Sequence, residues 1–202
     1  MNKISVVVFD LGNVLIPFNY QIMINKLEVI ELGLGQRFAE YYQSHYEIHR
    51  NFEKGLIEEE DFINLMLETI NYKIDGETFC KYYSEIFTIN ENVIELLPIL
   101  KEKFKLVLLS NTNGIHKKYG WENYSFINYF DKLILSHEVK AVKPERAIYL
   151  EVEKYTNRPS EEHIFIDDVL EYVEGAKNMG WDGIQFLGYD YLVEQLKVKK
   201  LL

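Results

Sequence analysis

The 202-residue sequence contains one cysteine, Cys80, and only four prolines. A single thiol cannot form an intramolecular disulfide, and a structural zinc site built on thiolates needs several of them. The fold must therefore be held by an apolar core. Apolar residues make up 48% of the chain, and a chain of this length buries roughly 70% of the surface that its unfolded state exposes. This composition predicts one folded domain, with or without a small insert, and excludes disorder as the main state.

Positive charge and long apolar runs are also scarce. Lys and Arg number 22 against 32 Asp and Glu, and the resulting net charge of −10 repels nucleic acids and anionic membranes. The first apolar run stops at Asp10, which is too short for the ~7–15-residue core of a signal peptide, and no uninterrupted run approaches the ~18 residues of a membrane span. We expect a cytoplasmic protein, monomeric or homodimeric, without nucleic-acid or membrane partners.

Five short apolar runs rich in aliphatic residues are bounded by polar or turn residues. They are Ile4–Phe9, Leu106–Leu109, Leu133–Leu135, Ile164–Ile166 and Ile184–Phe186. Such runs are typical of buried parallel strands. Between them the apolar spacing becomes helical, as at Ile148, Val152 and Tyr155. The alternation predicts an α/β fold, a doubly wound parallel sheet with helices on both faces.

The segment between the first two predicted strands, residues 10–105, is several times longer than one crossover needs. Its helical apolar pattern and its many charged residues and tyrosines predict a small inserted α-helical domain. Phe62, Met66 and Ile70 mark one amphipathic helix in it.

A second helix of this insert is predicted where Tyr41, His45 and His49 fall at positions i, i+4 and i+8. No third ligand is evident near the two histidines, so we interpret them as packing or surface residues and not as a metal pair. We interpret Tyr41, Tyr42 and Tyr46 as core or surface aromatics of the insert.

After the insert, a helix should begin near Asn90. Pro98 lies within it and lacks a backbone donor, which predicts a kink or an early end.

Polar residues follow the predicted strands at their carboxyl ends, the edge where doubly wound sheets bind ligands. These residues are Asp10, Ser110 with Asn111, Ser136, and Asp167 with Asp168, and Lys143 lies in the loop after the third strand. Three carboxylates in one crevice repel one another unless a proton or a hard cation neutralises them. Mg²⁺ suits such oxygen ligands and commonly recruits a phosphate. Ser110 and Lys143 can hold phosphate oxygens while one carboxylate attacks phosphorus.

Four segments resemble, in order, the four motifs of the haloacid dehalogenase (HAD) superfamily. They are Val6–Leu15 with Asp10, Leu108–Asn113, Lys143–Glu145 and Ile164–Asp168. The resemblance covers the whole chain and implies a HAD-like α/β core of residues 1–15 and 91–202 with a small helical cap of residues 16–90. The Asp-Leu-Gly-Asn and Ser-Asn-Thr-Asn sequences, with His116, are most similar to the sugar-phosphatase subgroup that includes α-D-glucose-1-phosphatase-like proteins.

The resemblance also implies a role for each motif residue. Asp10 would be the nucleophile that becomes an aspartyl phosphate, and Lys143 would act with it in catalysis. Phosphate or substrate contacts would come from Ser110, Asn111, Lys143 and His116. The ligands of Mg²⁺ would be Asp10, the Gly12 carbonyl and Asp168, with Asp167 as a ligand or a partner of one.

Gly12 departs from the superfamily pattern. Most phosphatases of the superfamily carry there a second aspartate that serves as general acid and base, and losing such a group costs ~10²–10⁴-fold in rate. An anomeric phosphate suits this gap, because its leaving oxygen is more acidic than that of an ordinary alcohol. Another proton donor, or slow turnover, would also account for it.

The implied function is Mg²⁺-dependent hydrolysis of a small phosphorylated metabolite, and a sugar phosphate is the favoured substrate class. Two alternatives remain. One is a 2-haloacid dehalogenase, which uses the same aspartate without metal and against which the adjacent Asp167 and Asp168 argue. The other is a catalytically weak member of the superfamily that binds a phosphometabolite or a protein, which Gly12 favours. The sequence does not identify the substrate.

Overall fold

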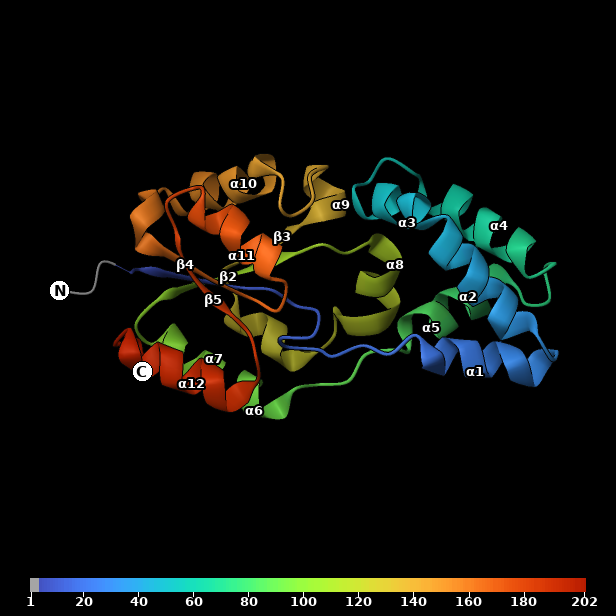
Figure 1. Cartoon of the computed structure of the whole chain (residues 1–202), viewed down its shortest axis with the longest axis horizontal. Helices are drawn as coiled ribbons and strands as arrows, with labels where there is room; N and C mark the ends of the chain where they lie inside the picture. The colour runs from blue at the N-terminus through green and yellow to red at the C-terminus, as the bar shows by residue number, and fades with distance from the viewer. Residues whose placement is uncertain (1–3) are drawn as a thin grey trace.

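The computed structural model of the protein describes residues 4–202. A five-stranded sheet with helices on both faces forms one end of the molecule, and a group of helices forms the other (Figure 1). The strands are β1 (Val6–Phe9), β2 (Lys105–Ser110), β3 (Lys132–Leu135), β4 (His163–Asp167) and β5 (Asp182–Gln185). Each of the five predicted strands is present, and the predicted doubly wound α/β fold is confirmed.

All pairings in the sheet are parallel, in the order β3-β2-β1-β4-β5. The central strand β1 pairs with β2 and β4, and Phe9 lies opposite Leu108 and Ile166. The chain builds the sheet outward from β1 in one direction and then in the other, which creates a topological switch point beside β1. The residues that follow β1, β2 and β4 consequently meet at one edge.

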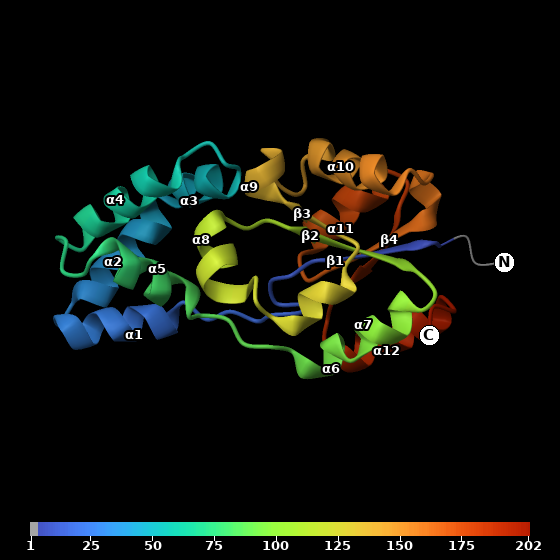
Figure 2. The ribbon, with the colours of Figure 1, turned by 180° about the vertical axis from the view of Figure 1, so that it is seen from behind.

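Side chains of β1 alternate between two buried layers, because successive residues of a strand point to opposite faces. The helices that cover the sheet are α7 (Leu96–Lys101), α9 (Ser136–Val139), α10 (Arg146–Thr156), α11 (Leu170–Lys177) and α12 (Tyr189–Val198). Val7 and Phe9 share an apolar cluster with α7 and α12, while Val6 and Val8 share one with α10 and with Ala176 of α11. Figure 2 shows these helices on the two sides of the sheet.

The predicted disturbance at Pro98 is present. The helix after the insert is divided at Glu95 into α6 (Glu91–Ile94) and α7. The division lies where the missing N–H of Pro98 would have met the carbonyl of Ile94, as expected for proline inside a helix.

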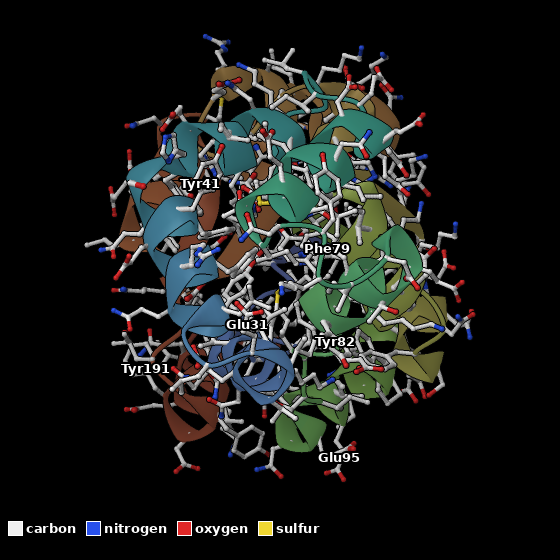
Figure 3. All side chains as sticks on the ribbon, turned by 90° about the vertical axis from the view of Figure 1, so that its right-hand side faces the viewer. Glu31, Tyr41, Phe79, Tyr82, Glu95 and Tyr191 are labelled. Carbon is white, nitrogen blue, oxygen red and sulfur yellow. The ribbon has the colours of Figure 1, made fainter. Side chains whose placement is uncertain are left out.

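Five helices lie apart from the sheet, and we call them the insert helices. They are α1 (Gln21–Ile30), α2 (Leu34–Ser44), α3 (Tyr46–Glu53), α4 (Glu59–Thr69) and α5 (Gly76–Ser84). Figure 3 views the molecule from their side, with Phe79 and Tyr41 labelled. They share a separate apolar cluster that includes Met23, Phe38, Phe62 and Phe79. This separate cluster supports the division into a core of residues 1–15 and 91–202 and a cap of residues 16–90, which remains a proposal.

One predicted helix of the insert is confirmed and the other is wrong. Phe62 and Met66 are buried on α4, as their spacing predicted. Tyr41, His45 and His49 do not share a helix, because His45 leaves helical geometry (φ −123°, ψ 39°) between α2 and α3. Its ring stacks on Tyr41, with centroids 4.2 Å apart. His49 lies on the next helix, α3. Within residues 4–202, no helix has the length and apolarity needed to span a membrane.

The buried side of α7 should be far more sensitive to truncation than the exposed tip of the insert. Leu97 is fully buried (0% exposed) and Leu32 is 94% exposed. We expect Leu97→Ala to lower the free energy of unfolding by about 2–5 kcal/mol, because it leaves a cavity. The matched change Leu32→Ala should stay within about 0.5 kcal/mol. Urea unfolding measures both, and equal losses would contradict this packing.

Candidate active site

A buried ammonium group joins two of the predicted strand-end carboxylates. Lys143 Nζ donates to Asp10 Oδ1 and to Asp167 Oδ2, both at 2.6 Å. Lys143 is 1% exposed and Asp167 is 0% exposed. Asp10 follows β1, Asp167 ends β4, and Lys143 lies in the loop between α9 and α10. Residues up to 157 positions apart in the sequence therefore meet at one point of the sheet edge.

The backbone of Lys143 is held by side chains from two sides. Asn111, directly after β2, accepts from the Lys143 N–H at 2.8 Å and donates to its carbonyl at 3.2 Å. Arg50 on α3 donates to the same carbonyl at 3.2 Å. The side-chain amide of Asn111 is thus engaged with Lys143, and its predicted contact with phosphate stays a prediction. Arg50 was not identified by the sequence analysis.

The three carboxylates of the predicted metal site lie together. Asp10, Asp167 and Asp168 each offer an oxygen atom, and these atoms lie within 4.8 Å of one another. Asp167 also accepts from the Val169 N–H at 2.8 Å, so both of its oxygens have donors. Asn13 donates to Asp168 at 3.2 Å. This arrangement favours Asp10 and Asp168 over Asp167 as direct ligands of a cation.

The electrostatics of the cluster show why it suits a divalent cation. Burial raises the pKa of Asp10 to about 7, with repulsion from Asp167 adding to the effect and Lys143 opposing it. Burial and Asp167 also raise the pKa of Asp168. Burial disfavours the charged form of Lys143, but attraction to Asp10 and Asp167 raises its pKa above the ordinary value. One ammonium group thus opposes the negative charge of three carboxylates. A hard cation would relieve the repulsion that remains among them.

Gly12 lies in a tight turn directly after the nucleophile candidate. Its carbonyl accepts from the Val14 N–H at 2.7 Å, and Asn13 has a positive φ of 55°. A carbonyl oxygen has a second lone pair, so the turn is compatible with the predicted metal contact, which stays a prediction. A Cβ atom at Gly12 would lie 3.2 Å from the ring of Phe18 and 4.0 Å from Asp10 Oδ2.

A cavity of about 240 Å³ lies between the sheet edge and the insert helices. Four predicted site residues line it, namely Gly12, Ser110, Asn111 and His116. Ser110 is 2% exposed, and its hydroxyl makes only a long contact of 3.4 Å, to the Asn111 carbonyl. Opposite these residues the lining comes from α2 and α3, through Tyr42, Tyr46, His49 and Glu53.

His116, which lines the cavity from the side of the sheet, is an uncharged hydrogen-bond donor. Asn113 accepts from the His116 backbone N–H at 2.9 Å, which orients the amide so that its NH₂ group faces His116 Nδ1 at 3.2 Å. Nδ1 is then the acceptor, and the proton lies on Nε2. Burial lowers the pKa of His116 to about 3, so the ring stays uncharged at neutral pH. Within the described part of the chain Nε2 has no hydrogen-bond partner.

The cavity wall formed by α2 and α3 was not predicted. Tyr42 and Tyr46 were interpreted as core or surface aromatics and His49 as a packing residue, but all three line the cavity. Glu53, also unpredicted, lies 3.3 Å from His49 Nε2 and 3.2 Å from Arg50 Nη1. The i, i+3 and i+4 spacing of these residues was visible in the sequence. It did not indicate which side of α3 faces the sheet.

Three comparisons relate the chain to known proteins. A family model for haloacid dehalogenase-like hydrolases matches residues 4–180. A drimenol cyclase of Aspergillus calidoustus is 26% identical over 96% of this chain, which spans 36% of that protein. A phosphorylated carbohydrates phosphatase of Thermotoga maritima is 28% identical, covering 88% of this chain and 82% of that protein. A D-ribitol-5-phosphate phosphatase of Bacteroides thetaiotaomicron is 23% identical, covering 89% and 90%.

A solved structure shares the whole architecture. It is an aspartate-to-alanine mutant of a HAD family enzyme from Bacteroides thetaiotaomicron in complex with magnesium and inorganic phosphate. The TM-score is 0.80 at 28% sequence identity, and the match covers 90% of this chain and 93% of that one.

The raised pKa of Asp10 has a consequence for stability. Its value rises from 3.8 to about 7, so the folded state holds this proton more tightly than the unfolded state. This tighter proton binding adds to the free energy of unfolding. The contribution is fully present below pH 3.8 and is lost as pH rises toward 7. Without metal, the melting temperature of Asp10→Asn minus that of the native protein should therefore increase as pH rises from 5 to 8. We expect about 5–10 °C, corresponding to about 2–3 kcal/mol.

Thermal unfolding in EDTA at the two pH values measures this gain. Asp61→Asn, an exposed change on α4, is the matched control. Its melting temperature should differ from that of the native protein by the same amount at both pH values. An Asp10→Asn offset that does not change with pH would contradict the pKa assigned to Asp10.

Proposed function

Because this chain belongs to the haloacid dehalogenase-like hydrolase family, we propose that it is a Mg²⁺-dependent phosphatase of a small phosphorylated metabolite, in particular a sugar phosphate. The reaction would proceed through an aspartyl phosphate on Asp10. The phosphorylated carbohydrates phosphatase and the D-ribitol-5-phosphate phosphatase among the similar proteins support this substrate class.

The buried contact of Lys143 with Asp10 and Asp167 is the observation that carries the proposal. Asp10 attacks phosphorus, the bond from phosphorus to the ester oxygen breaks, and the leaving alkoxide takes up a proton. Water then hydrolyses the acyl phosphate and restores Asp10. Lys143 keeps its positive charge throughout and neutralises phosphoryl oxygens. The hydroxyl of Ser110, which lines the adjacent cavity, donates to another of these oxygens.

The residues present fit a magnesium ion. Asp10, Asp168 and the Gly12 carbonyl would hold it, and Asp167 would keep Lys143 in place beside it. When bound, Mg²⁺ neutralises carboxylate and phosphate charge, which lets an anionic nucleophile approach an anionic substrate. The magnesium and phosphate complex of the Bacteroides enzyme supports this cofactor.

Gly12 sets the expected rate. Without an acid at this position, the leaving oxygen depends on its own acidity or on another donor, so esters with good leaving groups should react fastest. This feature is the one that favours the second candidate, a weakly catalytic binding protein. A 2-haloacid dehalogenase is disfavoured, because the substrate carboxylate would meet three carboxylates that only Lys143 balances.

Catalysis should depend on Asp10 and on the metal. We expect hydrolysis of sugar phosphates, with anomeric phosphates fastest, to need Mg²⁺ and to fall by about 10⁴-fold or more in Asp10→Asn. Phosphate release from a panel of phosphorylated metabolites, with Mg²⁺ or with EDTA, measures this. Asp61→Asn should behave like the native protein. Activity that survives Asp10→Asn would rule out this nucleophile, and chloride release from 2-chloro acids in EDTA would establish the dehalogenase instead.

Supplying an acid at position 12 should shift the leaving-group preference. Phe18, the ring nearest to a Cβ at Gly12, is 41% exposed and can move aside. We expect Gly12→Asp to increase the rate for alkyl phosphates relative to acetyl phosphate by about 10-fold or more, because only the former need protonation. Gly12→Asn has the same size without the proton and serves as control. An equal ratio in both variants would show that another group supplies the proton.

A further inference from the structure

The part of the cavity formed by the insert presents one carboxylate. Glu53 is 9% exposed and lines the cavity together with Gly12 and Ser110. Burial favours its neutral form, but the contacts with His49 and Arg50 outweigh burial and lower the pKa of Glu53. The group is therefore an ionised hydrogen-bond acceptor at neutral pH.

Two connections attach Glu53 to the catalytic edge of the sheet. Ser136 donates to the Glu53 carbonyl at 2.6 Å and accepts from the Thr112 N–H at 2.9 Å, two residues beyond Ser110. Arg50, which contacts the Glu53 carboxylate, also donates to the Lys143 carbonyl. Glu53 therefore stands at a set position relative to the residues proposed to hold the phosphate.

Aromatic rings make up most of the rest of this wall. Within residues 4–202, the cavity lining includes no lysine or arginine. The guanidinium of Arg50 is engaged with Glu53 and the Lys143 carbonyl. The other insert-side groups include His49, whose Nε2 lies 3.3 Å from Glu53, and the rings of Tyr20, Tyr42 and Tyr46. A carboxylate or a second phosphate on the leaving group would find no lysine or arginine in this lining and would face Glu53, which costs free energy.

The size of the cavity limits the leaving group further. About 240 Å³ is below the ~300–1,000 Å³ of sites for drug-sized ligands. It has room for one small polyol or sugar unit, whose C–H groups can lie against the tyrosine rings. Arg50 already balances the charge of Glu53, so the wall does not demand a cationic leaving group.

We propose that Glu53 determines specificity by accepting a hydrogen bond from a hydroxyl of an uncharged leaving group and by excluding leaving groups that carry an anion. His116 lines the same cavity, and its Nε2–H, which has no hydrogen-bond partner within residues 4–202, is the complementary donor for a hydroxyl or ring oxygen. The proposal rests on the phosphatase function proposed above and adds the residue that selects the substrate.

Matched pairs of esters test the exclusion in the native protein. Glucose 6-phosphate with 6-phosphogluconate, and glycerol 3-phosphate with 3-phosphoglycerate, differ by a carboxylate. We expect the neutral member of each pair to have a kcat/KM at least 10-fold higher with Mg²⁺. Equal values, or a preference for ethanolamine phosphate over both neutral esters, would overturn the proposal. This comparison needs no variant, so it tests the exclusion of anionic leaving groups even if substitutions at Glu53 impair folding.

Glu53→Gln tests the residue itself. We expect kcat/KM for the neutral esters to fall by about 10- to 100-fold relative to acetyl phosphate, the range for a lost hydrogen bond to a charged group. Most of the change should appear in KM. The control is Glu47→Gln, an exposed position on the same helix. A folded Glu53→Gln protein with an unchanged ratio, or with a loss confined to kcat, would overturn the assignment.

The two proposals fail in different ways. If the native protein turns over acetyl phosphate but does not distinguish the paired esters, the assignment of Glu53 alone is wrong. If it turns over neither acetyl phosphate nor any ester, the phosphatase function is wrong and the assignment falls with it.

Discussion

The contact of the Lys143 ammonium with Asp10 and Asp167 is the interaction on which the rest of the site depends. All three side chains are nearly inaccessible to solvent, and a buried carboxylate is tolerated only when it is paired. One positive charge cannot balance Asp10, Asp167 and Asp168, so the cluster retains excess negative charge. Burial, with repulsion from Asp167 adding to it, raises the pKa of Asp10. The excess negative charge makes the crevice suited to a divalent cation and, through the cation, to a phosphate.

The parallel sheet is what brings these charges together. Because β1 pairs in register with both β2 and β4, the residues after those strands emerge at one edge beside the switch point. The loop with Lys143 is then fixed by a side chain rather than by the sheet, since Asn111 binds both the N–H and the carbonyl of Lys143. Backbone register places the carboxylates, and one amide side chain places the lysine between them.

The insert helices complete the site from the other side. Arg50 contacts the Lys143 carbonyl, and Ser136 contacts the Glu53 carbonyl. The turn after α3 lies so close to the core that a Cβ at Gly55 would be 2.4 Å from the His137 carbonyl oxygen, and its φ is +68°. Only glycine fits both conditions. This close approach brings Glu53 and the tyrosines over the edge that we propose binds phosphate, where they would select the leaving group.

The sequence by itself determined the strands and the polar residues that follow them. Apolar runs followed by Asp10, Ser110 and Asp167 are local patterns, and strand ends in a parallel sheet share one edge, so the predicted carboxylates and Lys143 do meet. The wall of the cavity was decided by tertiary structure alone. His45 interrupts the helix that local spacing predicted, and the orientation of α3 depends on contacts such as that of Arg50 with Lys143, 93 residues away. Apolar spacing reveals which residues share a helix face, but contacts between distant segments decide what that face meets.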